Sequence, residues 1–345
     1  MSCNAVIHEL IQFLISIDQK QLMGEIYLVP LCNPLSINQR YHHFSTGRYN
    51  PYDGRDWNRI FWDYKKEKEN IFAFAQSQLN QHPETIRRQY LQKIQQSFPQ
   101  RHQQIQSPLS VPFRILYRYQ LQSLCLDANY IIDCHSATDR ALDYLYCFSS
   151  REDSAKGFLF PHAVLMNDYD WDAFDEAFLK PWLALEKCLA ELGQPIQFDV
   201  ESWTLELGGG QQIQPESVAN GVRGIKNYLA VKRMLDIPGF PLPETTAHQT
   251  QFHRKSEIQE YYAGSGGLVQ NLVELGTVVK AGQLLYSLLS FNKEGLPPEA
   301  IAIYAQTPGL VFNTTTNHAV NQGEYILSGR NHRKKSPSNK SPGNG

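Results

Sequence analysis

The spacing of apolar residues predicts a helix at the start of the chain and a strand soon after it. Apolar side chains recur there at helical intervals, as on one face of an amphipathic helix: Val6, Leu10, Phe13, Leu14 and Ile15. The apolar run EIYLVPL (25–31), which Asn33-Pro34 closes, predicts a strand. A polar, aromatic-rich loop follows from Ser36 to Asp56. Residues 62–105, rich in Gln, Lys, Arg and Glu, predict exposed helices.

The middle of the chain alternates apolar runs with amphipathic segments. Three runs predict strands, the last of which ends in glycines: NYIIDC (129–134), YLYCF (144–148) and SWTLELGGG (202–210). Residues 168–192 predict one long helix that is kinked or split near Pro181. Residues 215–235 predict another helix, which Pro215 opens favourably. This alternation indicates the α/β class, with a largely parallel or mixed sheet flanked by helices.

The pattern changes after the proline-rich linker IPGFPLPETT (237–246). Residues 251–328 consist of short β-type runs separated by glycines, which predicts a small all-β module. The tail from residue 331 is basic and polar, and we expect it to be disordered. The predicted organisation is an α/β catalytic domain at 1–240, a β-rich module at 248–330 and the tail at 331–345.

Composition and charge narrow the functional classes. Of 345 residues, 42% are hydrophobic and 19% are charged, as in ordinary globular proteins. The net charge of −2 gives no reason to expect nucleic acid or a membrane surface as a partner. Six scattered cysteines without a CxxC pair suit a reducing compartment. LIQFLISI (10–17) lacks a basic segment before it and is too short to span a membrane, so we expect a cytoplasmic protein.

Residues that could take part in catalysis lie near the ends of two predicted strands and in one loop. His135 comes just after Asp133, Glu206 precedes the glycines at 208–210, and Asn58 with Arg59 lies in a loop. In open α/β sheets ligands bind beyond the carboxyl ends of strands, so these side chains can converge. A histidine ligand, a carboxylate base and an arginine for an anion suit metal-assisted hydrolysis.

Each of these residues also has a structural alternative. A single histidine at a strand end is often a hydrogen-bonded structural residue, and Glu206 can be an exposed charge at the end of a strand. Arg59 can pair with Asp56 or Asp63 on the surface.

Four motifs in order favour the functional interpretation. They are NP (33–34), RYNPYDGRDWNRIF (48–61), DCHSATD (133–139) and TLELGG (204–209). In this order and with a β-rich region after them, they resemble the succinylglutamate desuccinylase/aspartoacylase family, a branch of the zinc carboxypeptidase-like fold. The resemblance covers about residues 1–330. It implies a zinc-dependent amidohydrolase, with one zinc ion per complete chain, that deacylates a small N-acyl amino acid or a related carboxylated amide.

The resemblance also implies roles for individual residues. His135 would be the third zinc ligand and Glu206 the general base. Asn58 and Arg59 would grip the carboxylate of a small-molecule substrate, and Asp56 would orient a zinc-bound histidine. Arg48 is a weaker candidate for substrate binding, and Arg40 or Arg55 could take its place. A homo-oligomer is possible.

The sequence departs from the family pattern at its start. Family members carry G-x-H-G-x-E after their first strand, and its His and Glu supply the other two zinc ligands. No HGxE occurs here, and MSCNAVIHELIQFL matches the segment that directly follows that motif. We therefore expect a truncated sequence whose activity is lost or impaired.

Four alternatives remain open at this stage. One is a metal-free pseudoenzyme that binds a small carboxylate, another is a different residue pair that has taken over the zinc, and a third is a zinc carboxypeptidase that acts on peptides. The fourth concerns GGLVQNLVELGTVVKAGQLL (266–285), which resembles the hairpin of biotinyl and lipoyl domains. A carrier role is disfavoured because Lys280 has no MKM or DKA context, so we expect this module to narrow the entrance to the active site.

Overall fold

The chain folds into two compact units. The computed structural model describes residues 1–33, 35, 47–67, 70–105, 111–166, 172–209, 212–243, 249–292 and 294–331. The first unit contains Met1–Ser136 and Asp143–Phe252, and the second contains Ala137–Leu142 and His253–Gly345. The segment Ala137–Leu142 leaves the predicted domain 1–240 because its strand β2 (Arg140–Ala141) pairs with β12 (Gly309–Thr314). Residues 332–345 of the predicted tail lie outside the described residues.

A mixed sheet forms the centre of the first unit, as the sequence predicts. Its strand order is β1-β5-β3-β4-β6. The bounds are β1 (Tyr130–Ala137), β3 (Tyr144–Phe148), β4 (His162–Met166), β5 (Glu201–Gly209) and β6 (Gln251–Arg254). Strand β3 is parallel to β4 and antiparallel to β5. The prediction of a mixed α/β fold is therefore confirmed.

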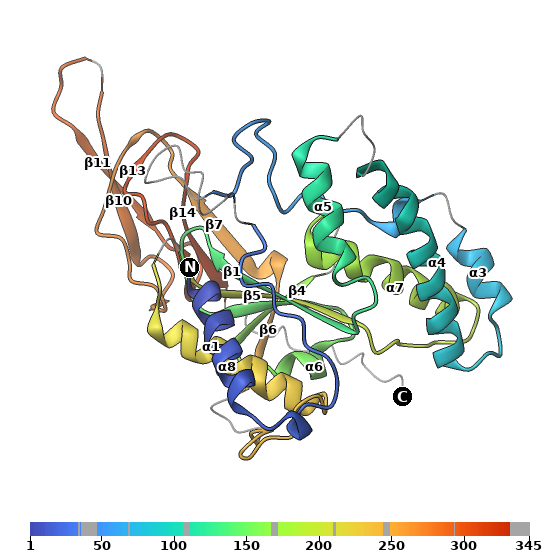
Figure 1. Ribbon diagram of the computed structural model, residues 1–345. Helices are drawn as coiled ribbons and strands as arrows, with labels where there is room; N and C mark the ends of the chain where they lie inside the picture. Colours follow the sequence, from blue (N-terminus) through green and yellow to red (C-terminus); the bar gives the residue numbers. More distant parts are fainter. Residues whose placement is uncertain are drawn as a thin grey trace, which may run out of the picture. The chain divides into compact units, whose positions relative to one another are not determined.

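Helices α1 (Ser2–Ser16) and α8 (Pro215–Val231) lie on one face of this sheet (Figure 1). Their apolar residues form a core with alternate residues of the strands, among them Leu145, Leu205 and Leu207. Gly221 of α8 allows a close approach, since a Cβ atom there would lie 2.8 Å from both Leu207 and Val6 side chains. The short helix α6 (Glu152–Lys156) follows β3.

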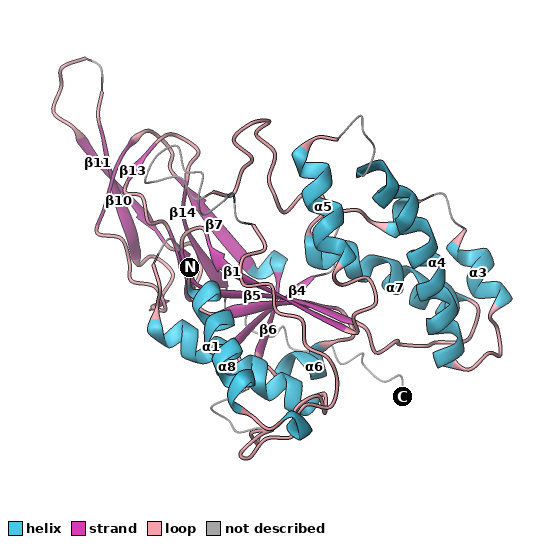
Figure 2. Ribbon diagram, viewed as in Figure 1, coloured by secondary structure: helices cyan, strands magenta, loops and turns pink. Residues whose placement is uncertain are grey.

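Helices α3 (Ile71–Ser77), α4 (Pro83–Ile105), α5 (Phe113–Ser123) and α7 (Phe174–Glu191) lie on the other side (Figure 2). The prediction of exposed helices over 62–105 is wrong in one respect. Helix α4 buries an aromatic and aliphatic stripe against α7, at a spacing of four residues: Ile86, Tyr90, Ile94 and Phe98. The polar composition of this segment concealed the stripe, since one face of a helix needs few apolar residues. Helix α7 contains Pro181 without ending there.

The predicted strand at 25–31 is wrong. No strand is present at these residues, and Tyr27, Val29 and Leu31 are exposed. The nearest pairing is an isolated antiparallel bridge between Leu22 and Leu235. A strand requires a hydrogen-bonded neighbour, and none of the described residues supplies one here. Short one-turn helices lie at Gln19–Gln21, Tyr64–Lys66 and Lys255–Glu257.

The second unit consists of antiparallel sheets, in agreement with the β-rich module that the sequence predicts. One sheet has the order β11-β10-β8-β13, and the other has the order β2-β12-β14-β7, with β9 on β12. The bounds are β7 (Ile258–Tyr262), β8 (Gly267–Gln270), β9 (Val278–Val279), β10 (Leu284–Ser290), β11 (Glu299–Tyr304), β13 (Ala319–Val320) and β14 (Tyr325–Asn331). Val269, Leu288, Val311 and Ile326 belong to their shared apolar core.

Membrane insertion has no support from the helices. Within the described parts of the chain, none of them combines the length and the apolar character that a bilayer crossing requires.

Candidate active site

The polar candidates of the first unit lie on the sheet face opposite α1 and α8. Side chains alternate between the two faces of a strand. Ile132 and Cys134 of β1 pack into the α1/α8 core, so Asp133 and His135 point to the other face. On β5, Leu205 and Leu207 belong to the same core, which leaves Glu206 on the face of His135. The alternation thus brings a histidine and two carboxylates together on neighbouring strands.

His135 is held between two carboxylates. Its Nε2 atom lies 2.8 Å from Asp133 Oδ2, and its Nδ1 atom lies 3.7 Å from Glu206 Oε1. Burial alone would lower the pKa of His135, but Asp133 and then Glu206 and Asp175 raise it to about 10. The imidazole therefore lies in a strongly anionic environment.

Glu206 has one oxygen without a hydrogen bond. Its Oε2 atom is buried and has no hydrogen-bond partner among the described residues. Burial raises the pKa of Glu206, with a further increase from Asp133, while His135 and Arg48 act in the opposite direction. A buried carboxylate with a raised pKa and an unused oxygen has the properties of a general base.

The glycines after Glu206 have a structural reason. Gly208 has a φ of +61°, which is a left-handed conformation that favours glycine. Its N–H donates to Asp143 Oδ1 over 2.9 Å, and a Cβ atom there would lie 2.5 Å from Gln214 Oε1. Gly208 lies inside β5, two residues after Glu206.

Asp56 organises the loop that carries the predicted substrate-binding residues. Its Oδ2 atom accepts a hydrogen bond from Arg48 Nε over 2.9 Å, and its Oδ1 atom accepts from the Asn58 N–H over 2.9 Å. The Asn58 side-chain oxygen accepts from the N–H of Phe174 at the start of α7. Asp56 thus forms an ion pair with Arg48, whereas Asp133 is the carboxylate that contacts His135. The predicted role of Asp56 toward a zinc-bound histidine stays a prediction.

Both predicted arginines belong to this region. Arg48 is close enough to Glu206 to lower its pKa. Arg59 donates a hydrogen bond to the carbonyl of Asn58 and is near enough to Tyr146 to lower the pKa of that phenol. Glu206 in turn raises the pKa of Tyr146. Arg48 and Arg59 are therefore both electrostatic neighbours of the group formed by Glu206 and Tyr146. Arg40 lies outside the described residues.

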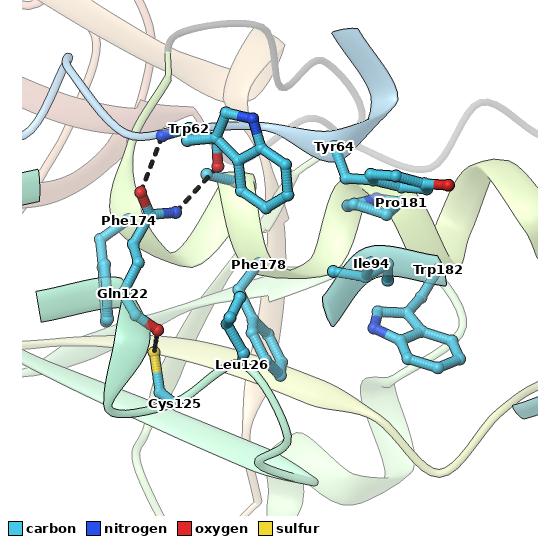
Figure 3. A pocket seen from close by; sticks show the side chains of 11 residues that line it. Trp62, Tyr64, Ile94, Gln122, Cys125, Leu126, Phe174, Phe178, Pro181 and Trp182 are labelled. Carbon is cyan, nitrogen blue, oxygen red and sulfur yellow. Dashed lines mark hydrogen bonds between the residues drawn. The ribbon is translucent and has the colours of Figure 1, made fainter. Parts of the chain in front are cut away.

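A hollow within the helical layer of the first unit is too small for an organic ligand. Aromatic and aliphatic side chains from the helical layer line it, and Gln122 holds Trp62 there through the backbone N–H and carbonyl at 2.9 and 2.8 Å (Figure 3). Its interior has room for about one water molecule. This hollow is therefore not a candidate for a substrate site.

Comparison with known proteins shows the family to which the chain belongs. Residues 1–232 match the model of the succinylglutamate desuccinylase/aspartoacylase catalytic domain. The chain belongs to this family. The resemblance drawn from the four sequence motifs is thus confirmed.

Solved structures of relatives share the fold. One is a structure from Shewanella amazonensis described as a succinylglutamate desuccinylase/aspartoacylase family protein, with 26% identity and a TM-score of 0.81 over 95% of this chain and 86% of that chain. Another, from Shewanella frigidimarina, has 23% identity and a TM-score of 0.83 over 95% of this chain and 85% of that chain. The second likeness shows the fold alone.

A curated relative carries the name of an enzyme. The N-alpha-acetyl-L-2,4-diaminobutyric acid deacetylase of Halomonas elongata is 25% identical over 209 residues. The match covers 58% of this chain and 49% of the relative, so the chain spans about half the length of the curated protein that it matches. By its name, this relative is a deacylase.

The described residues do not complete a zinc site. Among them, no group of three or more His, Cys, Asp and Glu side chains could hold a metal ion. His135 is a single imidazole whose two ring nitrogens both face carboxylates, whereas catalytic zinc takes about three protein ligands. The described residues therefore offer fewer donors than a catalytic zinc site needs, and the role of His135 as a ligand stays a prediction.

Sequence reasoning missed two neighbours of the site, Thr204 and Asp175. Thr204 Oγ1 donates to Asp175 Oδ2 over 2.7 Å, and Asp175 is electrostatically coupled to His135. Tyr144 and Tyr146 lie opposite Glu206 and Thr204. The two-residue interval from Thr204 to Glu206 is a signal that could have identified Thr204. The position of Asp175 depends on where α7 packs, and no local pattern reveals it.

Proposed function

We propose that this protein is an amide hydrolase, a deacylase of a small N-acyl amino acid or a related carboxylated amide. The observation that carries this proposal is Glu206, whose buried Oε2 atom has no hydrogen-bond partner among the described residues. Its Oε1 atom lies 3.7 Å from His135 Nδ1. Family membership and the deacetylase named above agree with this chemistry.

Glu206 would act as the general base. It takes a proton from the attacking water, the oxygen of which adds to the acyl carbonyl carbon. When the carbon–nitrogen bond breaks, the same proton passes to the departing nitrogen. A raised pKa suits both steps, because Glu206 must accept a proton and then release it near neutral pH.

The arginines would position the substrate. Arg48 is an electrostatic neighbour of Glu206 and Arg59 one of Tyr146. A planar guanidinium can bind a carboxylate through two hydrogen bonds. Asn58 supports this arrangement, since its side chain is fixed to the start of α7. Binding energy from the carboxylate would thus be used to orient the scissile amide against Glu206.

Zinc is the cofactor that we propose for this reaction, with His135 as the ligand that this chain offers. One imidazole holds zinc weakly, so we expect residues 1–345 to bind zinc poorly and to turn over substrate slowly. Metal analysis after dialysis tests this expectation. One tight equivalent of zinc, with turnover that a chelator abolishes, would contradict it.

The activity is tested with a panel of N-acetyl and N-succinyl amino acids, with and without added zinc, by the release of free amine. We expect at least one member to be hydrolysed, and Glu206→Gln to lower its rate by about 100- to 10,000-fold. Glu191→Gln, an exposed substitution on α7, is the matched control and should leave the rate unchanged. Full activity in Glu206→Gln would exclude this residue as the base.

A second candidate function is a metal-free protein that binds a small carboxylate. The incomplete donor set around His135 favours it. Calorimetry in the presence of a chelator separates the two candidates. Binding of the N-acyl amino acids without hydrolysis at any zinc concentration would support the binding protein and overturn the deacylase.

A further inference from the structure

Strands β3 and β5 present two tyrosines to the base. In their antiparallel register Tyr144 lies opposite Glu206, and Tyr146 lies opposite Thr204. Directly opposed residues have Cβ atoms about 5 Å apart and point to the same face. The intervening residues of β3, Leu145 and Cys147, are buried in the core under α1 and α8. The two phenols therefore lie on the sheet face that carries Glu206.

The two tyrosines differ in accessibility. Their hydroxyl oxygens are 3.3 Å apart, and their rings meet edge to face at 5.3 Å. Tyr144 is buried, with 7% of its surface exposed, whereas Tyr146 is only partly buried. Tyr146 is therefore the less buried residue of the pair, and its hydroxyl is within hydrogen-bond distance of that of Tyr144.

Tyr146 lies between groups of opposite charge. Burial and then Glu206 raise its pKa to about 12, Asp175 adds to this, and Arg59 acts in the opposite direction. The phenol is thus protonated at neutral pH and can donate a hydrogen bond. Both the proposed base and the arginine proposed to bind the carboxylate are its electrostatic neighbours.

We propose that Tyr146 is a specificity-determining residue, whose hydroxyl donates a hydrogen bond to the substrate carboxylate beside Arg59. In an N-acyl amino acid one carbon atom separates the carboxylate from the scissile amide nitrogen. The next residue pair of the two strands is Tyr146 with Thr204, so a substrate with its amide at Glu206 can extend its carboxylate to Tyr146. This inference rests on the proposed function, because it assumes that a carboxylated amide occupies the site.

Calorimetry with an N-acetyl amino acid tests the proposal independently of turnover. Loss of a hydrogen bond to a charged group should make Tyr146→Phe bind about 10- to 100-fold more weakly. Tyr144→Phe removes the neighbouring hydroxyl but keeps the Tyr146 hydroxyl that is proposed to contact the carboxylate. We therefore expect its affinity for the ligand to change by less than about threefold. The same ligand with a primary carboxamide in place of the carboxylate should bind Tyr146→Phe and the unchanged protein almost equally.

The outcomes distinguish this inference from the proposed function. If Tyr146→Phe binds the carboxylate ligand as tightly as the unchanged protein, the role of Tyr146 is wrong, even if Glu206→Gln still abolishes hydrolysis. If Tyr146→Phe weakens binding of the carboxamide ligand as much as binding of the carboxylate ligand, the phenol does not recognise the carboxylate. If turnover is measurable, Tyr146→Phe should raise KM and leave kcat nearly unchanged.

Discussion

Strand β5 carries two glutamates in opposite situations. Glu201, at its start, has both oxygens occupied: Oε1 accepts from Ser154 Oγ and Lys232 Nζ, both at 2.7 Å, and Oε2 accepts from the Tyr228 hydroxyl at 2.7 Å. Glu206, five positions later, has a histidine nitrogen 3.7 Å from Oε1 and no hydrogen-bond partner for Oε2 among the described residues. The same side chain on the same strand is satisfied at one end and unsatisfied at the other.

This difference separates a structural carboxylate from one suited to chemistry. A buried charge is tolerated when its hydrogen bonds are complete, and it destabilises the fold when they are not. The Glu201 cluster joins β5 to α6 and α8, so its hydrogen bonds stabilise the first unit. Glu206 is kept at the expense of stability, which is expected where a site must hold a reactive group.

The largest expected effect comes from removing the satisfied carboxylate. Glu201→Ala leaves the buried Tyr228 hydroxyl and Ser154 without their acceptor and leaves Lys232 with Asp199 alone. We expect a loss of about 3 to 5 kcal/mol in the free energy of unfolding. Urea denaturation followed by tryptophan fluorescence measures this. Glu206→Ala is the matched variant, and we expect it to leave stability unchanged or to raise it. A large loss in Glu206→Ala would show that its contacts are structural after all.

Tyr228→Phe should have a smaller effect on the same cluster. The Tyr228 hydroxyl donates to Glu201 and accepts from Trp203 Nε1 over 2.9 Å. Its removal deprives both buried groups of a partner, at about 1.5 to 3 kcal/mol for a hydrogen bond to a charged group. The comparison is Tyr144→Phe, whose hydroxyl lies beside the site and should contribute less. Equal losses in the two variants would remove the distinction between the two ends of the strand.

How far the sequence could predict this arrangement depends on the range of the contacts. Apolar alternation predicted β3 and β5, because one face of each strand packs against α1 and α8. The same signal was wrong at 25–31, where no neighbouring strand among the described residues completes the pairing. A local pattern thus predicts which residues can form a strand, whereas pairing decides whether they do.

The same distinction between local pattern and long-range contact applies to the site residues. His135, Glu206 and Arg59 were predicted because they belong to motifs next to strands or within one loop. Asp175 was not, because it reaches β5 only through the packing of α7, a contact across 29 positions of the chain. Asp133, on the same strand, is the carboxylate that contacts His135, and Asp56 pairs with Arg48. The role of Asp56 toward a zinc-bound histidine stays a prediction.

The smallest expected effect tests that unpredicted contact. Thr204 is buried on β5 between the two glutamates, and its hydroxyl donates to Asp175 at the start of α7. Thr204→Val keeps the shape and removes the donor, so we expect a loss of about 1 to 2 kcal/mol in the free energy of unfolding. Thr204→Ser keeps the donor and should lose less than Thr204→Val. If Thr204→Ser lost more stability than Thr204→Val, packing of the methyl group rather than the hydrogen bond would hold α7 against the strand. The hydrogen bond from Thr204 would then not fix the position of Asp175.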